Sequence, residues 1–242
     1  MKHTGTGFTT TLTAGELATC VERQLDSLFP DGTEARGTFR PYVDTALERL
    51  EHCFSSIHMK DYTDGIQTRF SHLHTDQYAA FLYSVSHAAY RAGGDPAVAS
   101  KVYALNKALH AIDVFYEVEL PNIFLFQHPV GTVLGRAQYA DYLFVAQRCT
   151  VGSNIDHRYP TLGEGVILCS GSALIGACAV GSNCWLSAGA QVMDTDLPSG
   201  TVTFGQSPNL VIKPTRRDAA RDIFGARARA SAAGVGAGQE TR

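Results

Sequence analysis

Hydrophobic and polar residues follow two different patterns along this chain, and the change between them divides it into two regions. From residue 14 to about residue 110, apolar residues recur every three or four positions, a spacing typical of amphipathic helices. The pattern predicts helices over residues 14–28, 39–57, 75–91 and 96–111. Thr75 or Asp76 is positioned to cap the third helix and Gly93-Gly94 to end it, while Asp95-Pro96 is a specific start signal for the fourth.

The helical spacing stops between residues 114 and 126. This segment is rich in β-branched and aromatic residues, which favours extended structure. Pro121 lies inside it, and proline lacks the N–H group that a central strand needs. We therefore expect a loop or an edge position around Pro121.

A six-residue period begins at Leu162. Large aliphatic residues occupy every sixth position, and a mostly small residue comes four positions after each of the first five. The aliphatic positions are Leu162, Leu168, Leu174, Val180, Leu186 and Val192, and the second set is Val166, Ser172, Cys178, Cys184 and Ala190. Neither a helix nor a flat strand has a period of six. The pattern is typical of a solenoid, in which three repeats complete one triangular coil and each aliphatic residue stacks on its counterpart three repeats later.

The same six-residue pattern extends upstream to about Leu134, but its register shifts twice. The phase slips by one residue before Val151 and again at an excursion over Asn154–Pro160. A loop inserted into a solenoid usually lies on its binding face. The repeat ends at Asp196-Leu197-Pro198, and residues 199–213 form a non-repeating extension.

These patterns predict an α+β protein in which a helical N-terminal domain precedes a left-handed parallel β-helix of hexapeptide repeats. The expected boundaries are residues 1–112 for the helical domain and 113–215 for the β-helix. Residues 216–242 are expected to form a flexible tail, because the chain from Gly225 onward is mostly Ala, Gly and Arg.

Composition narrows the classes of function. The 242 residues are 45% hydrophobic and 18% charged, and the net charge of −3 lacks the basic surplus typical of nucleic-acid-binding proteins. No apolar run reaches the roughly 18 residues of a membrane span, and the polar N-terminus does not resemble a signal peptide. We expect a cytoplasmic protein without a nucleic-acid or membrane partner. The six cysteines match no zinc pattern, so we expect no metal and interpret them as small buried residues.

The order of these regions and several short motifs resemble the serine acetyltransferase branch of the hexapeptide acyltransferases. The resemblance covers roughly residues 70–215 and is most specific at Gln127–Gly135, where the family has a catalytic His followed by a Gly and then an aliphatic-Gly pair. The excursion ending in Arg158-Tyr159-Pro160 resembles the family's acceptor loop. Further similar segments are Thr150–Gly152, Glu164–Val166, Gly205–Pro208 and Leu210–Pro214.

The resemblance implies an enzyme that moves an acetyl group from acetyl-CoA to a hydroxyl or amine of a small acceptor. It also implies a homotrimer or a dimer of trimers, with the site between neighbouring β-helices. Acyl transfer from a thioester needs a base for the attacking group and donors for the oxyanion. Imidazole suits the base role because its pKa of about 6.5 lies near working pH. The resemblance gives this role to His128, a residue that sequence alone would favour as structural.

A carboxylate usually orients a catalytic imidazole, and two residues compete for this role. Glu119 matches by local sequence the acidic residue that follows the last helix in the family, and we favour it slightly. Asp113 precedes His128 by nearly the length of one coil, so it could lie one coil away. Glu117 is a third option.

The resemblance also assigns the binding residues. Arg158 pairs with an acceptor carboxylate or is an ordinary surface arginine, and Asp76 binds the acceptor's ammonium group or caps a helix. Gln127 and Tyr159 complete the acceptor site. The residues carried over to coenzyme binding are Ser170, Gly171 and Ala188, with Lys213 and Arg216 or Arg217 at the nucleotide phosphates.

The chain departs from the family pattern at three points. Gln127 stands where the family usually has Asp, and Tyr159 stands where it usually has His. The end Glu240-Thr241-Arg242 replaces the C-terminal Ile that docks into a partner sulfhydrylase, so we expect no cysteine-synthase complex. We infer acyl transfer with an acceptor pocket altered from one for free serine.

Four functions are compatible with this sequence. The first is O-acetylation of serine or a related small amino acid. The second is N- or O-acylation of an amino sugar or a specialised-metabolite intermediate, and the third is a non-catalytic β-helix binding protein. Metal-dependent hydration of the carbonic anhydrase kind ranks last, because it needs three His ligands on facing coils and only His128 and His157 lie in this region.

Overall fold

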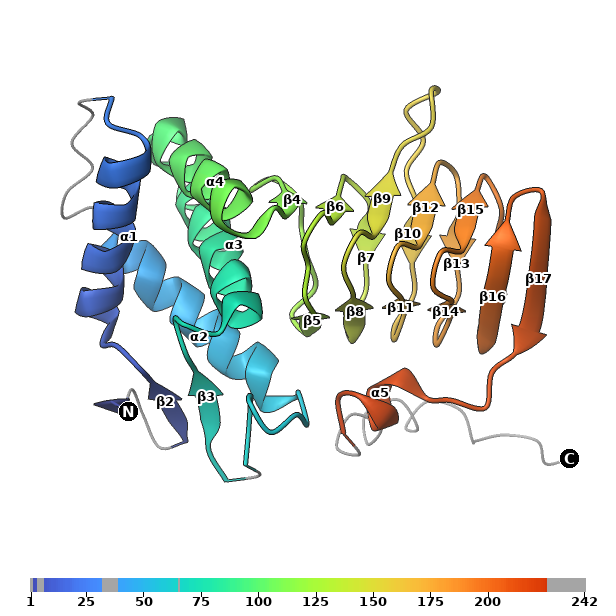
Figure 1. Cartoon of the computed structure of the whole chain (residues 1–242), viewed down its shortest axis with the longest axis horizontal. Coiled ribbons are helices and arrows are strands. Elements are labelled where there is room, and N and C mark those ends of the chain that lie inside the picture. The colour runs from blue at the N-terminus through green and yellow to red at the C-terminus, as the bar shows by residue number, and fades with distance from the viewer. Residues whose placement is uncertain (1, 4–6, 32–38, 65, 226–242) are drawn as a thin grey trace, which may run out of the picture.

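A helical part and a β-helix lie side by side along the long axis of the molecule (Figure 1). The computed structural model describes residues 2–3, 7–31, 39–64 and 66–225. The helical part contains α1 (Ala14–Leu28), α2 (Arg40–Ser55), α3 (Thr75–Arg91) and α4 (Pro96–His110), with a small sheet of β1 (Lys2–His3), β2 (Phe8–Thr10) and β3 (Thr68–Phe70). No helix in this described part of the chain is long and apolar enough to cross a membrane.

The four helices form where the hydrophobic spacing predicts them. Thr13 and Glu16 close a capping box at the start of α1, and Asp95 accepts a hydrogen bond from the Ala97 N–H at the start of α4. The expected cap of α3 is wrong. Its N-cap is His74, which makes no side-chain capping hydrogen bond. The short strands β1 to β3 were not predicted, because two or three residues are too few to show an alternating pattern.

The left-handed β-helix has three faces of parallel strands. The first face consists of β5 (Phe124–Phe126), β8 (Leu143–Val145), β11 (Ile167–Leu168), β14 (Trp185–Leu186) and β16 (Thr201–Gln206). The second face consists of β4 (Asp113–Val114), β6 (Val133–Leu134), β9 (Thr150–Gly152), β12 (Ala173–Ile175) and β15 (Gln191–Met193). The third face consists of β7 (Gln138–Tyr139), β10 (Thr161–Leu162) and β13 (Ala179–Val180).

The strand register confirms the six-residue repeat. Leu162 pairs with Val180, Leu168 with Leu186 and Leu174 with Val192, so each residue meets its counterpart three repeats later. All six repeating aliphatic residues are at most 4% exposed, and all five residues of the second set are at most 2% exposed. Cys178 and Cys184 belong to that second set and are buried free thiols, as expected of small residues that fit the narrow interior of a coil.

The chain turns between the faces at three edges. The first edge, between the first and second faces, comprises residues 127–131, 146–149, 169–172 and 187–190 in successive coils. Backbone hydrogen bonds link these corners in order, from Arg148 N–H to the Val130 carbonyl, then from Gly171 to Gln147, then from Gly189 to Ser170. The second edge, between the second and third faces, comprises residues 135–137, 152–160, 176–178 and 194–196. These edges position the side chains that the sequence marks as functional.

Two irregularities interrupt the coils. Leu134 pairs with Val151, one position short of three full repeats, which is the predicted slip of one residue. Ala173 pairs with Thr150 across more than three repeats of chain, because the excursion adds residues between β9 and β10. Figure 1 shows this excursion projecting from the β-helix. At the far end β16 pairs antiparallel with β17 (Asn209–Pro214), so a hairpin closes the solenoid.

The C-terminal part of the described chain runs back from this hairpin toward the helices (Figure 1). It carries the short helix α5 (Ala219–Asp222), capped by Asp218. Phe224 is 1% exposed against Tyr142, and the Ile223 carbonyl accepts a hydrogen bond from the His58 N–H. Residues 216–225 of the predicted tail are therefore ordered, and residues 226–242 lie outside the described part. One continuous hydrophobic cluster joins the helical part to the β-helix.

Candidate active site

His128 lies on the first edge, in the coil next to the helical part. It follows β5 after one residue, Gln127, whose N–H donates a hydrogen bond to the Val145 carbonyl of the next coil. Its backbone has a φ of 50°, in the left-handed region that non-glycine residues seldom adopt. Its side chain is 75% exposed. The turn therefore presents the imidazole outward from the edge.

Asp76 is the carboxylate that meets His128. It lies in the first turn of α3, and its side chain is 8% exposed. Oδ2 of Asp76 accepts a hydrogen bond of 3.0 Å from the His128 N–H and lies 3.7 Å from His128 Nδ1. The second distance is longer than a hydrogen bond but within the range of an ion pair. The same carboxylate oxygen thus holds the strained backbone and faces the ring.

The carboxylates expected beside His128 make other contacts in this structure. Glu119 lies 3.5 Å from His87 Nε2 and is 66% exposed. Asp113 accepts a hydrogen bond of 2.6 Å from the Tyr103 hydroxyl and one of 2.5 Å from Lys107 Nζ. Burial alone would raise the pKa of Asp113, but these two donors outweigh it and hold the pKa below its ordinary value. Glu117 pairs with Arg136 at 2.7 Å.

Distance along the chain explains why Glu119 and Asp113 were expected beside His128 and Asp76 was not. Glu119 and Asp113 are near His128 along the chain, whereas Asp76 comes from a helix 52 residues earlier. Asp113 pairs in register with Val133 and therefore lies on the second face, where its carboxylate contacts Tyr103 and Lys107. The helix cap that was the alternative for Asp76 is also wrong, because its carboxylate is directed at His128.

The predicted coenzyme residues share the first edge with His128. Ser170 and Gly171 lie two coils beyond it, and Ala188 lies three coils beyond it. Because neighbouring strands are about 4.8 Å apart, the edge from His128 to Ala188 is about 14 Å long. Gly171 and Gly189 each have a positive φ, and a Cβ added to either would meet no atom within 4 Å. This chain therefore leaves the edge uncovered.

Lys213 lies at the far end of the same solenoid. It is exposed on β17, where it pairs with Val202 of the first face. Arg216 and Arg217 follow it and are also exposed, and the Arg217 guanidinium lies 3.9 Å from Asp222. The described structure thus provides positive charge beyond the coil that carries Ala188.

Arg158 and Tyr159 lie on the second edge, in the excursion. Asn154 forms the base of this loop, where its side-chain oxygen accepts hydrogen bonds from the N–H groups of Asp156 and Arg158. Its Nδ2 donates to Asp194 Oδ1 at 2.8 Å, which ties the loop to the neighbouring coil. Both predicted acceptor residues are exposed, and the structure does not bring them together with His128 of the same chain.

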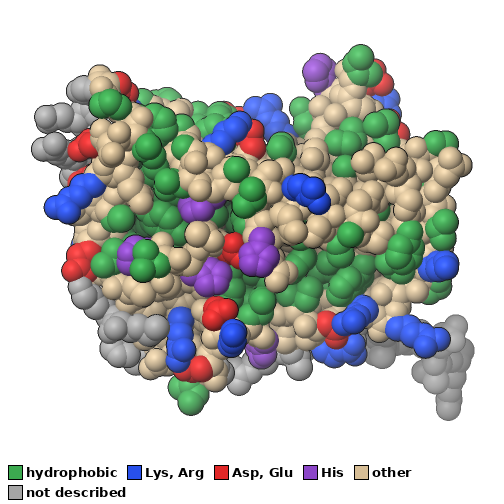
Figure 2. Space-filling view, in the orientation of Figure 1, with side chains coloured by type: hydrophobic (Ala, Val, Ile, Leu, Met, Phe, Trp, Pro, Cys, Tyr) green, Lys and Arg blue, Asp and Glu red, His purple; other side chains and the backbone are tan. Residues whose placement is uncertain are grey.

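Two residues near His128 were not predicted. His110 ends α4, and Ala111 after it accepts a hydrogen bond from the Gly131 N–H on the coil of His128. Arg148 lies on the first edge, one coil beyond His128, and adds a positive charge there. Figure 2 shows histidine side chains gathered where the helical part meets the β-helix. The coil repeat could have indicated Arg148, because it places this residue in a corner of the first edge, next to Cys149. No sequence pattern relates His110 to Asp76.

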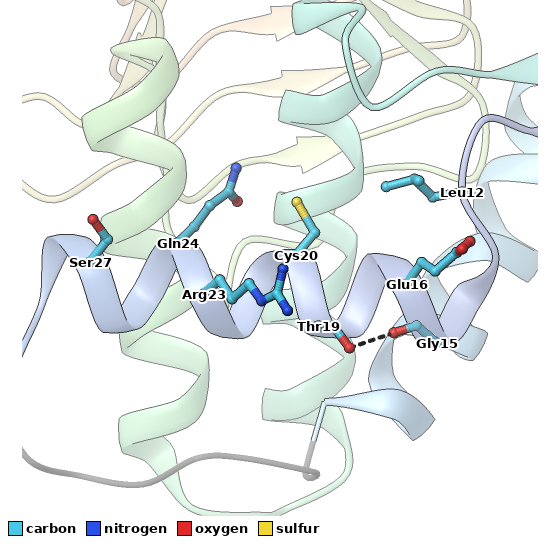
Figure 3. Close-up of a pocket in the computed structure, with 8 residues that line it drawn as sticks. All are labelled: Leu12, Gly15, Glu16, Thr19, Cys20, Arg23, Gln24 and Ser27. Atoms are coloured by element: carbon cyan, nitrogen blue, oxygen red, sulfur yellow. Dashed lines mark hydrogen bonds between the residues drawn. The ribbon is translucent and has the colours of Figure 1, made fainter.

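A surface cavity of about 640 Å³ lies elsewhere, along α1. Leu12 and side chains of one face of that helix line it, among them Cys20, Arg23 and Gln24 (Figure 3). None of the predicted site residues contributes to it. Within the described residues, no group of three or more His, Cys, Asp or Glu side chains is arranged to hold a metal ion.

Comparison with known proteins supports the resemblance seen in the motifs. No family model matches the chain. A serine acetyltransferase of Helicobacter pylori is 25% identical over 120 residues, which are 48% of this chain and 70% of that protein. One of Synechococcus elongatus is 26% identical over 114 residues, 46% of each chain, so the match spans less than half of that protein.

Solved structures extend the likeness to the helical part. The serine acetyltransferase of Vibrio cholerae superposes with a TM-score of 0.65 at 18% identity, covering 84% of this chain and 80% of that one. A serine acetyltransferase in complex with CoA gives a TM-score of 0.61 at 14% identity, covering 83% and 84%. In sequence over about half its length and in fold over most of it, the chain is similar to the serine acetyltransferases of the hexapeptide-repeat type.

Proposed function

We propose that this protein is an acetyl-CoA-dependent acyltransferase that moves an acetyl group to the hydroxyl of serine or a related small amino acid. His128 is the general base. One observation carries the proposal: an exposed imidazole, backed by the buried carboxylate of Asp76, stands on the same open edge as the predicted coenzyme residues.

The chemistry follows from the position of the ring. With a proton on Nδ1 facing Asp76, His128 has a lone pair on Nε2 for the proton of the acceptor hydroxyl. The hydroxyl oxygen attacks the thioester carbonyl, and the C–S bond breaks as the tetrahedral intermediate collapses. The proton held on Nε2 then passes to the thiolate that leaves. Asp76 stabilises the imidazolium between these two steps.

The first edge suits an extended thioester. Gly171 and Gly189 leave clearance beside the main chain, and the exposed Ala188 adds only a methyl group. A solved relative of the same fold is in complex with CoA, which supports CoA as the ligand. Lys213, with Arg216 or Arg217, supplies positive charge for phosphates beyond the last coil.

The acceptor site uses Asp76 for an ammonium group and Gln127 beside the base. Arg158 and Tyr159 belong to the second edge, so they reach His128 only if they come from a neighbouring copy. We therefore propose a trimer, or a dimer of trimers, in which the excursion of one copy faces the first edge of the next. In this arrangement residues 1–112, 113–215 and 216–242 act as helical domain, acyltransferase domain and C-terminal segment.

A panel of acceptors tests the reaction. Thiol release from acetyl-CoA is measured with serine, homoserine, threonine and amino sugars, and the product is identified by mass spectrometry. We expect release that requires an amino-acid hydroxyl. H128A should lower kcat about 10²- to 10⁴-fold, whereas H52A, which removes an exposed histidine of α2, should leave kcat unchanged.

Other outcomes would point to the alternatives. Full activity in H128A would contradict the mechanism. Turnover with amino sugars alone would favour the second function. Binding of acetyl-CoA without turnover of any acceptor would favour a non-catalytic binding protein, for which the substitutions at Gln127 and Tyr159 are the motivation.

A further inference from the structure

One corner position of the first edge has a left-handed backbone in four successive coils. The strand register of the second face aligns Gly131, Arg148, Gly171 and Gly189 at this position. Their φ angles are 72°, 56°, 70° and 73°. Glycine adopts such angles at little cost, but a residue with a Cβ is strained there. Arg148 is therefore strained at a position where the other three coils have glycine.

The contacts of the Arg148 side chain do not account for this strain. The residue is exposed, and no described residue forms a hydrogen bond or ion pair with its guanidinium. Backbone strain of this kind is concentrated at functional sites, where the side chain has a role that outweighs the cost. We therefore interpret Arg148 as a functional residue of the first edge.

The Arg148 side chain bends toward the coil of His128. A Cβ built on Gly131 would lie 3.4 Å from Arg148 Cγ but 4.0 Å from Arg148 Cα, so the side chain turns back over Gly131. Gly131 comes three residues after His128 in the same corner. Val130 between them is 59% exposed, so the surface beside this corner is open to a ligand.

Arg148 also ends the open path proposed for the coenzyme. At Gly171 and Gly189 an added Cβ would meet no atom within 4 Å, so a ligand can approach the main chain closely. In the next coil toward His128, a long cationic side chain replaces that clearance. A thioester that follows the two glycines therefore brings its acyl end to the guanidinium and the imidazole together.

We propose that Arg148 is a catalytic residue that stabilises the oxyanion of the tetrahedral intermediate. This inference rests on the proposed acyl transfer, in which His128 and Asp76 provide the base and not the oxyanion donor. When the acceptor oxygen bonds to the carbonyl carbon, the π electron pair of the C=O bond moves onto the carbonyl oxygen. The guanidinium donates hydrogen bonds to this oxygen and keeps its protons. The electron pair returns as the C–S bond breaks.

Replacing Arg148 by the residue of the other coils is a sharp test. R148G relieves the strained backbone, so we expect no loss of unfolding free energy in urea. Its kcat should fall about 10- to 10³-fold, with both KM values changed much less. R148K keeps the charge without the planar fork and should be intermediate. R91Q, which removes an exposed arginine at the end of α3, should leave kcat unchanged.

Two kinetic results would overturn the inference. One is a kcat of R148G within about threefold of wild type. The other is a raised KM for serine at unchanged kcat, which would assign Arg148 to the acceptor carboxylate. Chemical rescue adds a readout that a structural role would not produce. Methylguanidinium should restore part of the kcat of R148G in a saturable manner and should not restore that of H128A.

A binding measurement separates this proposal from the proposed function. S-carboxymethyl-CoA carries a carboxylate near the position of the thioester oxygen, and S-carboxamidomethyl-CoA is its neutral counterpart. In calorimetry, wild type should bind the charged analogue about tenfold more tightly, and R148G should bind the two alike. If no acceptor is turned over but this preference occurs, the anion site at Arg148 stands and acyl transfer fails. If acceptors are turned over and wild type lacks the preference, or R148G retains it, the assignment of Arg148 is wrong.

Discussion

The two ends of the β-helix differ in regularity and in chemistry. In the far coils, between Leu162 and Val192, each residue pairs with its counterpart three repeats later, and the first edge carries small side chains such as Ala188. In the coil next to the helical part, the pairing of Asp113 with Val133 departs from that period, and the edge carries His128 with a strained backbone.

The difference teaches where a solenoid acquires reactive groups. A regular coil fills its interior with aliphatic residues and presents a uniform, open edge. Its own repeat provides no buried charge beside that edge. At the near end, α3 brings Asp76 to His128, and Ala111 after α4 accepts a hydrogen bond from the Gly131 N–H of the same coil. Under the proposed function, the far coils form a wall for the coenzyme, and the junction with the helical part supplies the catalytic groups.

The largest effect that tests this division is on stability. Leu174 is fully buried between Val151 and Val192 of the neighbouring coils. L174A should lower the free energy of unfolding by about 2–5 kcal/mol, through lost burial and the cavity left behind. Urea unfolding at matched protein concentration measures it, with the exposed T161A as a control expected to stay within about 0.5 kcal/mol. The kcat of the folded variant should be unchanged. A large loss of kcat at native conditions would show that the far coils also support catalysis, which would contradict this division.

The sequence predicted the regular part of the molecule almost completely. A period of six survives in a single sequence because each Leu or Val must fill the same narrow coil. The helices were likewise predicted from apolar spacing and from the Asp95-Pro96 start. Both patterns are local, so a single sequence records them.

The candidate site was predicted less well, because its contacts are not local. His128 was identified only through the family motif, and its carboxylate was sought nearby at Glu119 and Asp113. The strand register places Asp113 on the second face, and the packing of α3 brings Asp76 to His128. His110 and Asp76 share no spacing that periodicity would detect. The packing of α3 against α4 brings them together, as the contact between Tyr78 and His110 shows.

Removing the charge at the junction should have a smaller effect than removing a core leucine. D76N keeps an oxygen for the His128 N–H but loses the negative charge that stabilises the imidazolium. We expect kcat to fall about 10- to 100-fold, which is about 1.4–2.7 kcal/mol of activation free energy. E119Q is the matched control, since Glu119 is 66% exposed beside His87. If E119Q lost more activity than D76N, the carboxylate favoured by the family motif would be the true partner of His128.

The smallest predicted effect is on coenzyme binding along the far coils. Ala188 lies on the open first edge, and a glutamate there would place bulk and negative charge in the path proposed for the coenzyme. A188E should raise KM for acetyl-CoA about tenfold, about 1.4 kcal/mol, with little change in KM for the acceptor. T161E introduces the same charge on the third face, where its strand neighbours are Gln138 and Ala179, and should leave both constants unchanged. A rise in acceptor KM in A188E would mean that the acceptor, and not the coenzyme, extends along this edge. The far coils would then take part in acceptor recognition, and the contrast between the two ends would be lost.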